Sequence, residues 1–339
     1  MKEILFVYPK KVSFIDLDIK LLSSEFKVFK NYYSWDKKIF VPFFLFHQFF
    51  LVLFKVRNYH AIIISFGGYW ALIPTLLGKL FRKPVYIIIH GSDAVSFPEI
   101  NYGSFRKKIL SIVLNLCYKM ADRLLPVSES LVYTENSFYK KNIILKQGFS
   151  VELPNLKTPY SVIYNGFDLE KWYLSNNKQN TFIAVFSESQ FELKGGDLIL
   201  AIADSFPNYN FKIVGLKTPD FIEHKPVNVQ FMGRKSSEEL ALEYSLAKYY
   251  FQLSSFEGFG CSLCESMLSG CIPIVSSVNI LPLIVGDTGY ILEERSVDKL
   301  KKLINSVVSS IEIKPSPRMR IINQFSMEKR KVKLIKTIK

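Results

Sequence analysis

The chain has 339 residues, enough for about two domains, and its 49% hydrophobic content can fill two cores. This composition excludes an intrinsically disordered chain. Lysine and arginine outnumber aspartate and glutamate by 44 to 30, which gives a formal net charge of +14 and a pI near 9.4, so the partners to expect are anionic: nucleic acid or a membrane surface.

Apolar runs of strand length alternate with helix-length segments along the whole chain. In the first half these runs lie at 4–8, 61–66, 85–89 and 124–127. In the second half they lie at 182–186, 211–214, 229–232, 249–253 and 272–275. Continuous apolar strands separated by helices are typical of parallel sheets covered on both faces, so we predict two doubly wound α/β domains. Ligands of such domains bind at the carboxyl ends of the strands.

Residues 39–57 combine an excess of phenylalanine with two cations at the carboxyl end, Lys55 and Arg57. A proline and two polar residues interrupt the run, which falls short of the roughly 20 apolar residues that a membrane-spanning helix needs. Two interpretations remain open: a helix that lies on an anionic membrane surface, or a core helix packed on the first sheet. The aromatic residues favour the membrane surface, and no nucleic-acid-binding motif appears.

A polar stretch at 173–180 separates two strand signals and is typical of a linker. We therefore place the domain boundary near Asp168, with domains at 1–168 and 169–317. Apolar residues recur at helical spacing over 318–339, which predicts a C-terminal helix.

The most distinctive stretch is 254–265, where a glycine-rich turn joins a buried strand to a helix. This pattern places Glu257 in the turn and Glu265 on the helix. Gly258 and Gly260 allow the backbone to approach a ligand closely, and the free amides of the first helical turn form an anion site. A diphosphate fits such a site.

Glu257 and Glu265, eight residues apart around this turn, resemble the Glu-x7-Glu motif of the retaining glycosyltransferases of family 4. Further matches follow in the order of the family: His90-Gly91-Ser92-Asp93, 122–130, Asn165-Gly166-Phe167-Asp168, Lys194-Gly195 and 270–275. The resemblance implies a GT-B fold, in which two Rossmann-like domains face a central cleft. It assigns acceptor binding to 1–168 and nucleotide-sugar binding to 169–317, and it implies that the helix at 318–339 crosses back to the first domain.

The resemblance also implies roles for individual side chains. Breaking the bond between the anomeric carbon and the diphosphate develops positive charge on the sugar and negative charge on the leaving phosphate, so an enzyme must stabilise both. Lys194 and the helix N-terminus at Gly260 and Cys261 are the candidates for the phosphate, and Glu257 is the candidate for the sugar hydroxyls. Glu265 is expected to accept hydrogen bonds from the ribose hydroxyls.

Gly258 and Phe259 complete the predicted donor-binding turn. His90 follows a buried strand, and we predict that it hydrogen-bonds the donor sugar or the incoming hydroxyl. In the family, retention of anomeric configuration is thought to occur without a covalent enzyme intermediate, and the departing phosphate helps to deprotonate the acceptor. We therefore assign no separate general base.

Two departures from the family pattern stand out. The arginine usual before the Lys-Gly pair is absent from 187–193, and Arg234 is the candidate to replace it. The loop after the first strand carries Lys10 and Lys11 in place of paired glycines, and these lysines either contact a phosphate on donor or acceptor or are solvated. We group Asp93 with them as an acceptor-loop residue. Either departure could instead mark a weak or inactive enzyme.

Four cysteines and no amino-terminal signal peptide favour a reducing compartment. Cys261 and Cys264 have the spacing of half a zinc site, but no second Cys or His pair follows, so we expect them to pack in the helix. We expect no metal and no cofactor beyond the donor itself.

These observations predict a cytoplasmic, metal-independent glycosyltransferase of the hexosyltransferase type, peripheral on the inner face of the cell membrane. It is expected to move a sugar from a nucleotide-diphosphate donor to a lipid-linked or glycan acceptor in cell-envelope, lipopolysaccharide or surface-polysaccharide synthesis, with 39–57 on the anionic membrane and no nucleic-acid partner. Two alternatives stay open: a nucleotide-sugar epimerase of the same fold, and a non-catalytic membrane-docking scaffold.

Overall fold

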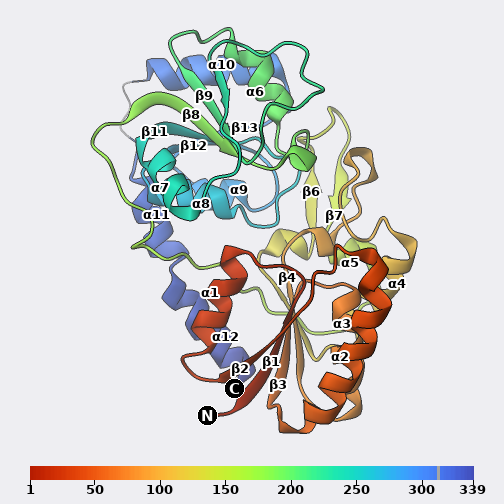
Figure 1. Ribbon diagram of the computed structural model, residues 1–339. Helices are drawn as coiled ribbons and strands as arrows, with labels where there is room; N and C mark the ends of the chain where they lie inside the picture. The colour runs from red at the N-terminus through yellow and green to blue at the C-terminus, as the bar shows by residue number, and fades with distance from the viewer. Residues whose placement is uncertain (311–313) are drawn as a thin grey trace. The chain divides into compact units, whose positions relative to one another are not determined.

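The computed structural model describes residues 1–310 and 314–339. The chain divides into two compact units. Unit 1 comprises Met1–Thr134, Lys146–Gly166 and Met327–Lys339, and unit 2 comprises Glu135–Leu145 and Phe167–Ser326. Each unit is built around one parallel sheet with helices on both faces (Figure 1). This confirms the two doubly wound α/β domains predicted from the alternation of strands and helices.

The sheet of unit 1 has five parallel strands in the order β2-β1-β3-β4-β5. Their bounds are β1 Glu3–Tyr8, β2 Lys27–Tyr32, β3 Ala61–Ser65, β4 Val85–Ile89 and β5 Arg123–Pro126. The side chains of β3 are buried on both faces of the sheet, as its unbroken apolar run requires. The order reverses between β1 and β3, so the loops after these strands diverge at the carboxyl edge and leave room for a ligand.

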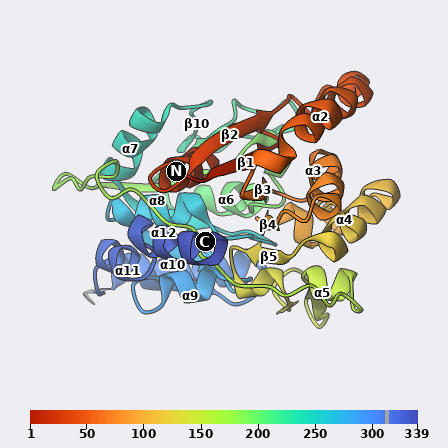
Figure 2. The same cartoon turned by 90° about the horizontal axis from the view of Figure 1, so that it is seen from below.

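Helices cover both faces of this sheet. On one face α1 (Ser13–Leu22) packs against α12 (Met327–Ile338), and on the other α2 (Val41–Lys55), α3 (Tyr69–Leu80) and α4 (Lys108–Met120) lie side by side (Figures 1 and 2). The short helix α5 (Phe149–Glu152) and the small two-stranded sheet of β6 (Thr134–Asn136) and β7 (Leu145–Gln147) follow later in the chain.

The sheet of unit 2 has six parallel strands in the order β10-β9-β8-β11-β12-β13. Their bounds are β8 Gln179–Val185, β9 Asn210–Val214, β10 Val229–Phe231, β11 Ala247–Gln252, β12 Ile272–Ser276 and β13 Tyr290–Leu292. The order reverses between β8 and β11, so the ligand-binding position of this sheet lies at the carboxyl ends of these two strands.

The helices of unit 2 also form two layers. On one face α6 (Gly196–Ala203) packs against α10 (Val297–Ser309). On the other, α8 (Cys261–Leu268) contacts both α7 (Ser237–Leu246) and α11 (Pro317–Gln324), and α11 also contacts α9 (Leu281–Val285). Helix α8 begins directly after Gly260, where the sequence predicts the start of a helix.

Two stretches of the chain differ from the predicted domain boundaries. Residues 135–145 belong to unit 2, where the side-chain amide of Asn136 donates to the carbonyl oxygen of Ser255 (2.7 Å). The C-terminal helix predicted at 318–339 is two helices, α11 in unit 2 and α12 in unit 1. The chain leaves helical geometry at Phe325, whose carbonyl oxygen accepts from the backbone amide of Phe167 (3.1 Å).

Helix α2 occupies most of the phenylalanine-rich segment 39–57, and it turns its aromatic side outward. Gln48 and Val52 are its buried residues, whereas Phe43, Phe46 and Phe54 are 62%, 64% and 77% exposed. The interpretation of α2 as a core helix is therefore wrong for most of its phenylalanines. In the described ranges no helix combines the length and apolarity needed to cross a bilayer.

Candidate functional site

The loops after β8 and β11 meet at the point where the strand order of unit 2 reverses. Gly195 has a φ of 75°, which favours glycine, and a Cβ atom there would lie 2.6 Å from the carbonyl oxygen of Leu253. The backbone amide of Ser255 donates to the carbonyl oxygen of Leu193 (2.8 Å). The turn at 193–195 is thereby fixed against the end of β11, and this places Lys194 beside the glycine-rich turn.

Lys194 and Glu257 form an ion pair at this position. The ammonium group of Lys194 donates to Oε2 of Glu257, and the two side chains are 14% and 13% exposed. Each side chain is thus mostly desolvated but still accessible to a ligand. Of the predicted site residues, the structure brings these two into direct contact.

The carboxylate of Glu257 is held by further partners that the motif did not reveal. Its Oε2 atom accepts hydrogen bonds from Nε2 of Gln252 (2.8 Å) and Oγ of Ser254 (3.3 Å). Its backbone amide donates to Oδ1 of Asn279 (2.9 Å). Asn279 adopts a φ of 51°, a left-handed conformation that asparagine tolerates better than most residues. These contacts fix Glu257 before any ligand binds, which is the preorganisation that a binding site needs.

The glycine-rich turn leads into α8 as predicted. Gly260 is the N-cap of α8 and has a left-handed conformation, with a φ of 92°. As at any helix N-terminus, the backbone amides of the first turn have no acceptor within the helix. Phe259 is 2% exposed and packs its ring against Phe167 and Phe325. Its ring lies in the core, so Phe259 shapes the turn and does not present a surface to a ligand. Cys261 keeps part of its surface exposed.

Glu265 lies one turn into α8, in a poorly solvated place. Burial raises the pKa of its carboxyl to about 8, and the charge of Lys171 opposes that shift. Burial raises the pKa of the hydroxyls of Tyr244 and Tyr250 well above their usual value, and the charge of Glu265 adds to both shifts. A carboxyl with a pKa of about 8 is mostly protonated near neutral pH, so Glu265 can donate as well as accept a hydrogen bond.

Arg234, the proposed substitute for the missing arginine, is exposed in the loop after β10. The stretch at 187–193, which lacks the arginine usual in the family pattern, contains the short 3-10 helix Glu188–Gln190.

Unit 1 carries its own cluster around His90, at the carboxyl end of β4. Nε2 of His90 lies 2.9 Å from Oγ of Ser65, and the ring packs between Phe14 and Phe66, with centroids at 4.8 and 4.3 Å. Burial and the charges of two nearby cations hold the pKa of His90 well below its usual range, so the imidazole is neutral. Its Nδ1 atom is buried and has no hydrogen-bond partner among the described residues. A neutral ring with one unused nitrogen can bind a hydroxyl.

Asp93 and Lys10 complete this cluster in different ways. Asp93 is 1% exposed, and its carboxylate accepts from the backbone amides of Gly67 (2.9 Å), His90 (3.0 Å) and Gly91 (2.9 Å). The carboxylate of Asp93 thus holds this loop in place, and its predicted role as an acceptor-loop residue stays a prediction. Lys10 lies over the ring of Phe66 (5.0 Å), and desolvation lowers the pKa of its ammonium group although Asp93 opposes the shift.

Lys11 packs over the ring of Tyr32 (5.4 Å), on the neighbouring strand β2. No group of three or more His, Cys, Asp or Glu side chains able to hold a metal ion occurs within 1–310 and 314–339. Neither Cys261 nor Cys264 forms a disulfide in these ranges, and burial raises the pKa of Cys264 well above its usual value.

Sequence reasoning missed Gln252, Ser254 and Asn279. Gln252 and Ser254 had a usable signal, since they are polar residues two positions apart at the end of an apolar strand and so point to the same side. Asn279 lies 22 residues beyond Glu257 and approaches it only through the fold.

Residues 171–324 match the family model described as "Glycosyl transferases group 1". Among curated proteins, an uncharacterized glycosyltransferase of Methanocaldococcus jannaschii is 26% identical over 251 residues, which cover 71% of this chain and 63% of that protein. O-antigen chain mannosyltransferase B of Escherichia coli is 32% identical over 72 residues, 21% of this chain and 19% of that protein. The chain spans less than two thirds of the length of either relative.

Solved structures share the fold over nearly the whole chain. Sucrose-phosphate synthase from Thermosynechococcus elongatus matches with a TM-score of 0.76 and 13% identity, covering 99% of this chain and 98% of that one. Anabaena HepE in complex with UDP and glucose matches with 0.75 and 13%, covering 100% and 99%. The lipopolysaccharide outer core galactosyltransferase WaaB matches with 0.66 and 14%, covering 99% of each. The chain therefore has the GT-B fold, and its residues 171–324 are similar to the group 1 glycosyl transferases.

Proposed function

We propose that the chain is a retaining, hexosyltransferase-type glycosyltransferase that moves a sugar from a nucleotide-diphosphate-sugar donor to a glycan or lipid-linked acceptor. The observation that carries this proposal is the ion pair of Lys194 and Glu257 at the ligand-binding edge of unit 2, in the turn that leads into α8. A donor diphosphate would compete for Lys194 and bind at the N-terminus of α8. Glu257 would then accept hydrogen bonds from the sugar.

The comparisons support the donor and acceptor classes. Residues 171–324 match the model of the group 1 glycosyl transferases, and the structure of HepE, which has a similar fold, contains UDP and glucose. The names of two similar proteins, a mannosyltransferase of the O-antigen chain and a galactosyltransferase of the lipopolysaccharide outer core, favour an acceptor in the cell envelope. In unit 2, Glu265 would bind the ribose hydroxyls and Arg234 would approach the diphosphate. In unit 1, His90 would contact the reacting sugar or hydroxyl.

The proposal extends to location. The outward phenylalanines of α2 and the cations at its carboxyl end support contact of 39–57 with anionic lipid. The enzyme would then act as a peripheral protein on the cytoplasmic face of the membrane, where a lipid-linked acceptor is presented.

The first experiment is a thermal-shift panel of UDP, GDP, ADP, CMP and dTDP with their common sugar conjugates, on the wild type and on Glu265→Ala. A ligand that binds only the folded state raises the melting temperature. One nucleotide family should shift the wild type and shift the variant less. If no nucleotide shifts the wild type, the scaffold alternative replaces the transferase. If a bound donor is isomerised without any acceptor, the epimerase alternative does.

We further propose that transfer needs no metal and no cofactor, because Lys194 and the α8 amides supply the positive charge that the leaving diphosphate requires. With the donor identified, activity should be unchanged in excess EDTA. Nuclear magnetic resonance of the product should show the anomeric configuration of the donor, and an inverted product would overturn the assignment as a retaining enzyme.

A further inference from the structure

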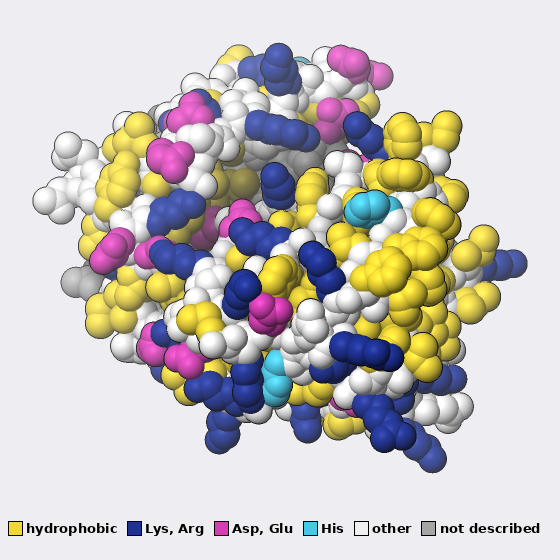
Figure 3. Space-filling view, turned by 60° about the horizontal axis from the view of Figure 1, so that its bottom comes forward, with side chains coloured by type: hydrophobic (Ala, Val, Ile, Leu, Met, Phe, Trp, Pro, Cys, Tyr) yellow, Lys and Arg dark blue, Asp and Glu magenta, His cyan; other side chains and the backbone are white. Residues whose placement is uncertain are grey.

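Three parallel helices of unit 1 share one outward face. α2 packs on α3, and α3 packs on α4, all on the same side of the sheet (Figures 1 and 2). Large apolar side chains are exposed on every one of them: Phe43, Phe46, Phe50 and Phe54 on α2, Leu76 and Leu80 on α3, and Ile109, Ile112 and Leu116 on α4. We call these nine residues the outer apolar face. Exposed apolar side chains gather in this way on one flank in Figure 3.

In this face α2 reverses the usual pattern of a surface helix, which buries its apolar side chains and exposes its polar ones. On α2 the polar Gln48 is buried and donates to Asn31 (2.7 Å) and to the carbonyl oxygen of Trp70 (3.1 Å), while the phenylalanines face outward. On α4 the exposed residues recur at intervals of three and four, which makes a continuous stripe. A surface that exposes its apolar side chains and buries a polar one requires an apolar partner.

Cations predominate around this face. Residues 37–92 contain seven lysine and arginine residues and no aspartate or glutamate. Lys107 and Lys108 begin α4 and are exposed, although a helix N-terminus favours anions and disfavours cations. Their position is unfavourable for the isolated helix, and an anionic partner would compensate for it. A predominantly cationic border around apolar side chains complements an anionic lipid surface better than a protein surface of mixed charge.

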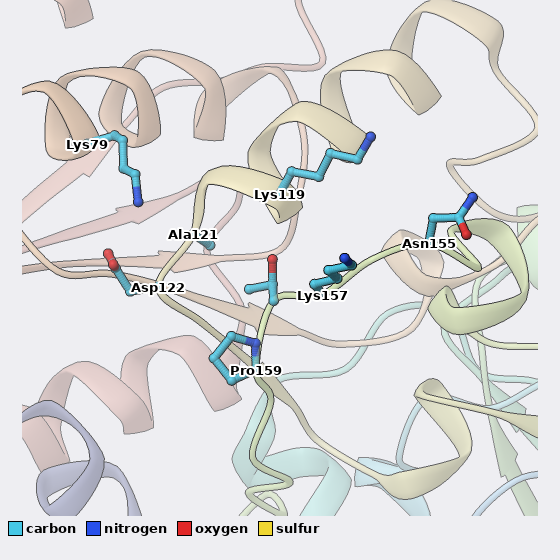
Figure 4. Close-up of a pocket in the computed structure, with 8 residues that line it drawn as sticks. Lys79, Lys119, Ala121, Asp122, Asn155, Lys157 and Pro159 are labelled. Atoms are coloured by element: carbon cyan, nitrogen blue, oxygen red, sulfur yellow. The ribbon is translucent and has the colours of Figure 1, made fainter.

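A pocket lies where the face ends, at the carboxyl ends of α3 and α4 (Figure 4). It has a volume of about 480 Å³, and its lining includes Lys79, Lys119, Lys157 and Asp122. Oδ2 of Asp122 accepts from the backbone amide of Val85 (2.8 Å), so this carboxylate is already engaged. Lys119 continues the α4 stripe one turn beyond Leu116, and three lysines against one aspartate leave the pocket cationic.

We propose that the outer apolar face is a single docking surface for anionic phospholipid, in which α4 inserts beside α2 and the pocket of Lys79, Lys119 and Lys157 binds a headgroup phosphate. The proposal deepens the membrane location proposed above and rests on it. It adds two groups of residues, the α4 stripe and the lysine pocket, that lie outside 39–57. Donor binding in unit 2 is independent of both.

The stripe is tested with the full chain and with vesicles of phosphatidylcholine, with or without 30% phosphatidylglycerol. Ile109→Ser/Ile112→Ser should bind the anionic vesicles at least roughly 100-fold more weakly than the wild type, because the lipid no longer buries two large aliphatic side chains. The matched control is Val227→Ser/Leu242→Ser, which removes two exposed apolar side chains of unit 2. Equal binding by the stripe variant and the control would overturn the role of α4, and melting curves of both variants exclude unfolding as the cause.

The pocket is tested with Lys79→Gln/Lys119→Gln/Lys157→Gln against Lys146→Gln/Lys302→Gln/Lys336→Gln, which removes three exposed lysines elsewhere. At about 1 kcal/mol for each cation near an anionic surface, the pocket variant should lose roughly 100-fold in affinity. The same loss in the control would show that only net charge matters and would overturn the pocket. If Phe43→Ser/Phe46→Ser/Phe50→Ser releases the protein while the stripe and pocket variants bind normally, this inference fails and the proposed location stands. Thermal shifts with nucleotides in all variants report separately on the transferase.

Discussion

At the scale of single residues, burial strongly perturbs the carboxyl of Glu265 on α8. Its pKa is raised to about 8 by burial, against an ordinary value of 4.5. A carboxyl with a raised pKa in the folded state binds its proton more tightly there than in the unfolded chain. The stability that this proton contributes is present in full below pH 4.5 and is lost as the pH rises toward 8.

Replacing Glu265 with glutamine should therefore change how stability depends on pH. The variant cannot ionise, so its melting temperature should fall less than that of the wild type between pH 5 and pH 8.5. Differential scanning fluorimetry across that range measures the effect. The control is Glu243→Gln, at a residue of α7 whose carboxylate pairs with Lys212 on β9. Parallel curves for wild type and Glu265→Gln would contradict the raised pKa.

Glu257 differs from Glu265 because it is paired and preorganised. Glu257→Gln keeps the shape of the side chain but removes the charge that balances Lys194. With the donor diphosphate free to take Lys194, nucleotide affinity should be kept within about threefold, whereas turnover should fall by roughly 100-fold, the size of effect seen when one preorganised polar contact is lost. Calorimetry with the nucleoside diphosphate and a transfer assay separate the two. Equal losses in both would mean that Glu257 shapes the pocket as a whole.

At the scale of elements, the last helix of the chain is held in unit 1 by one buried ion pair. Arg330 on α12 makes a two-pronged contact with Asp18 on α1 (2.5 and 2.7 Å) and donates to the carbonyl oxygens of Ile163 (2.9 Å) and Tyr164 (2.8 Å). Both charged side chains are buried. Such a pair needs the planar fork of arginine, since a lysine cannot make all four hydrogen bonds.

Arg330→Met should destabilise the chain by about 3–5 kcal/mol, because it leaves the carboxylate of Asp18 buried and uncompensated. Arg330→Lys should restore little of this loss. The double variant Asp18→Asn/Arg330→Met should be more stable than Arg330→Met alone, because the unpaired charge is gone. Urea unfolding measures these three variants and the single variant Asp18→Asn. A double variant as unstable as the sum of Asp18→Asn and Arg330→Met would contradict coupling between the two side chains.

The elements that the sequence revealed are those with a strong local signal. β3 and β4 are unbroken apolar runs, and α8 follows a glycine turn, so their positions were predicted to within a residue or two. The edge strand β2 buries one of its six residues and β13 has three residues, so neither shows an apolar run long enough to detect. The break between α11 and α12 depends on the pairing of Phe325 with Phe167, a contact that spans more than 150 residues and leaves no local pattern.

At the scale of the whole molecule, the difference between local and distant signals also explains which residues of the candidate site the sequence could predict. The glycine turn, Glu257 and Lys194 follow strands, so the rule for parallel sheets places them at one edge. The partner Asn279 and the burial of Phe259 and Asp93 depend on the packing of segments far apart in sequence. The membership of 135–145 in unit 2 likewise follows from contacts such as that of Asn136 with Ser255.

The net charge of +14 also acts at this scale, and it predicts how vesicle binding depends on salt. Raising the salt from 0.1 M to 1 M shortens the Debye length from about 10 Å to about 3 Å, so the attraction to anionic lipid should weaken. Salt does not weaken the burial of apolar side chains. The wild type should therefore lose most, but not all, of its binding to anionic vesicles at 1 M salt.

Phe43→Ser/Phe46→Ser/Phe50→Ser separates these two contributions, because it leaves the net charge unchanged. This variant should bind anionic vesicles weakly at 0.1 M salt and not at all at 1 M, whereas Val227→Ser/Leu242→Ser should follow the wild type. Cosedimentation over the salt series measures all three proteins. Complete release of the wild type at 1 M would show that charge alone holds it, and binding indifferent to salt would show that the cations around the outer apolar face take no part.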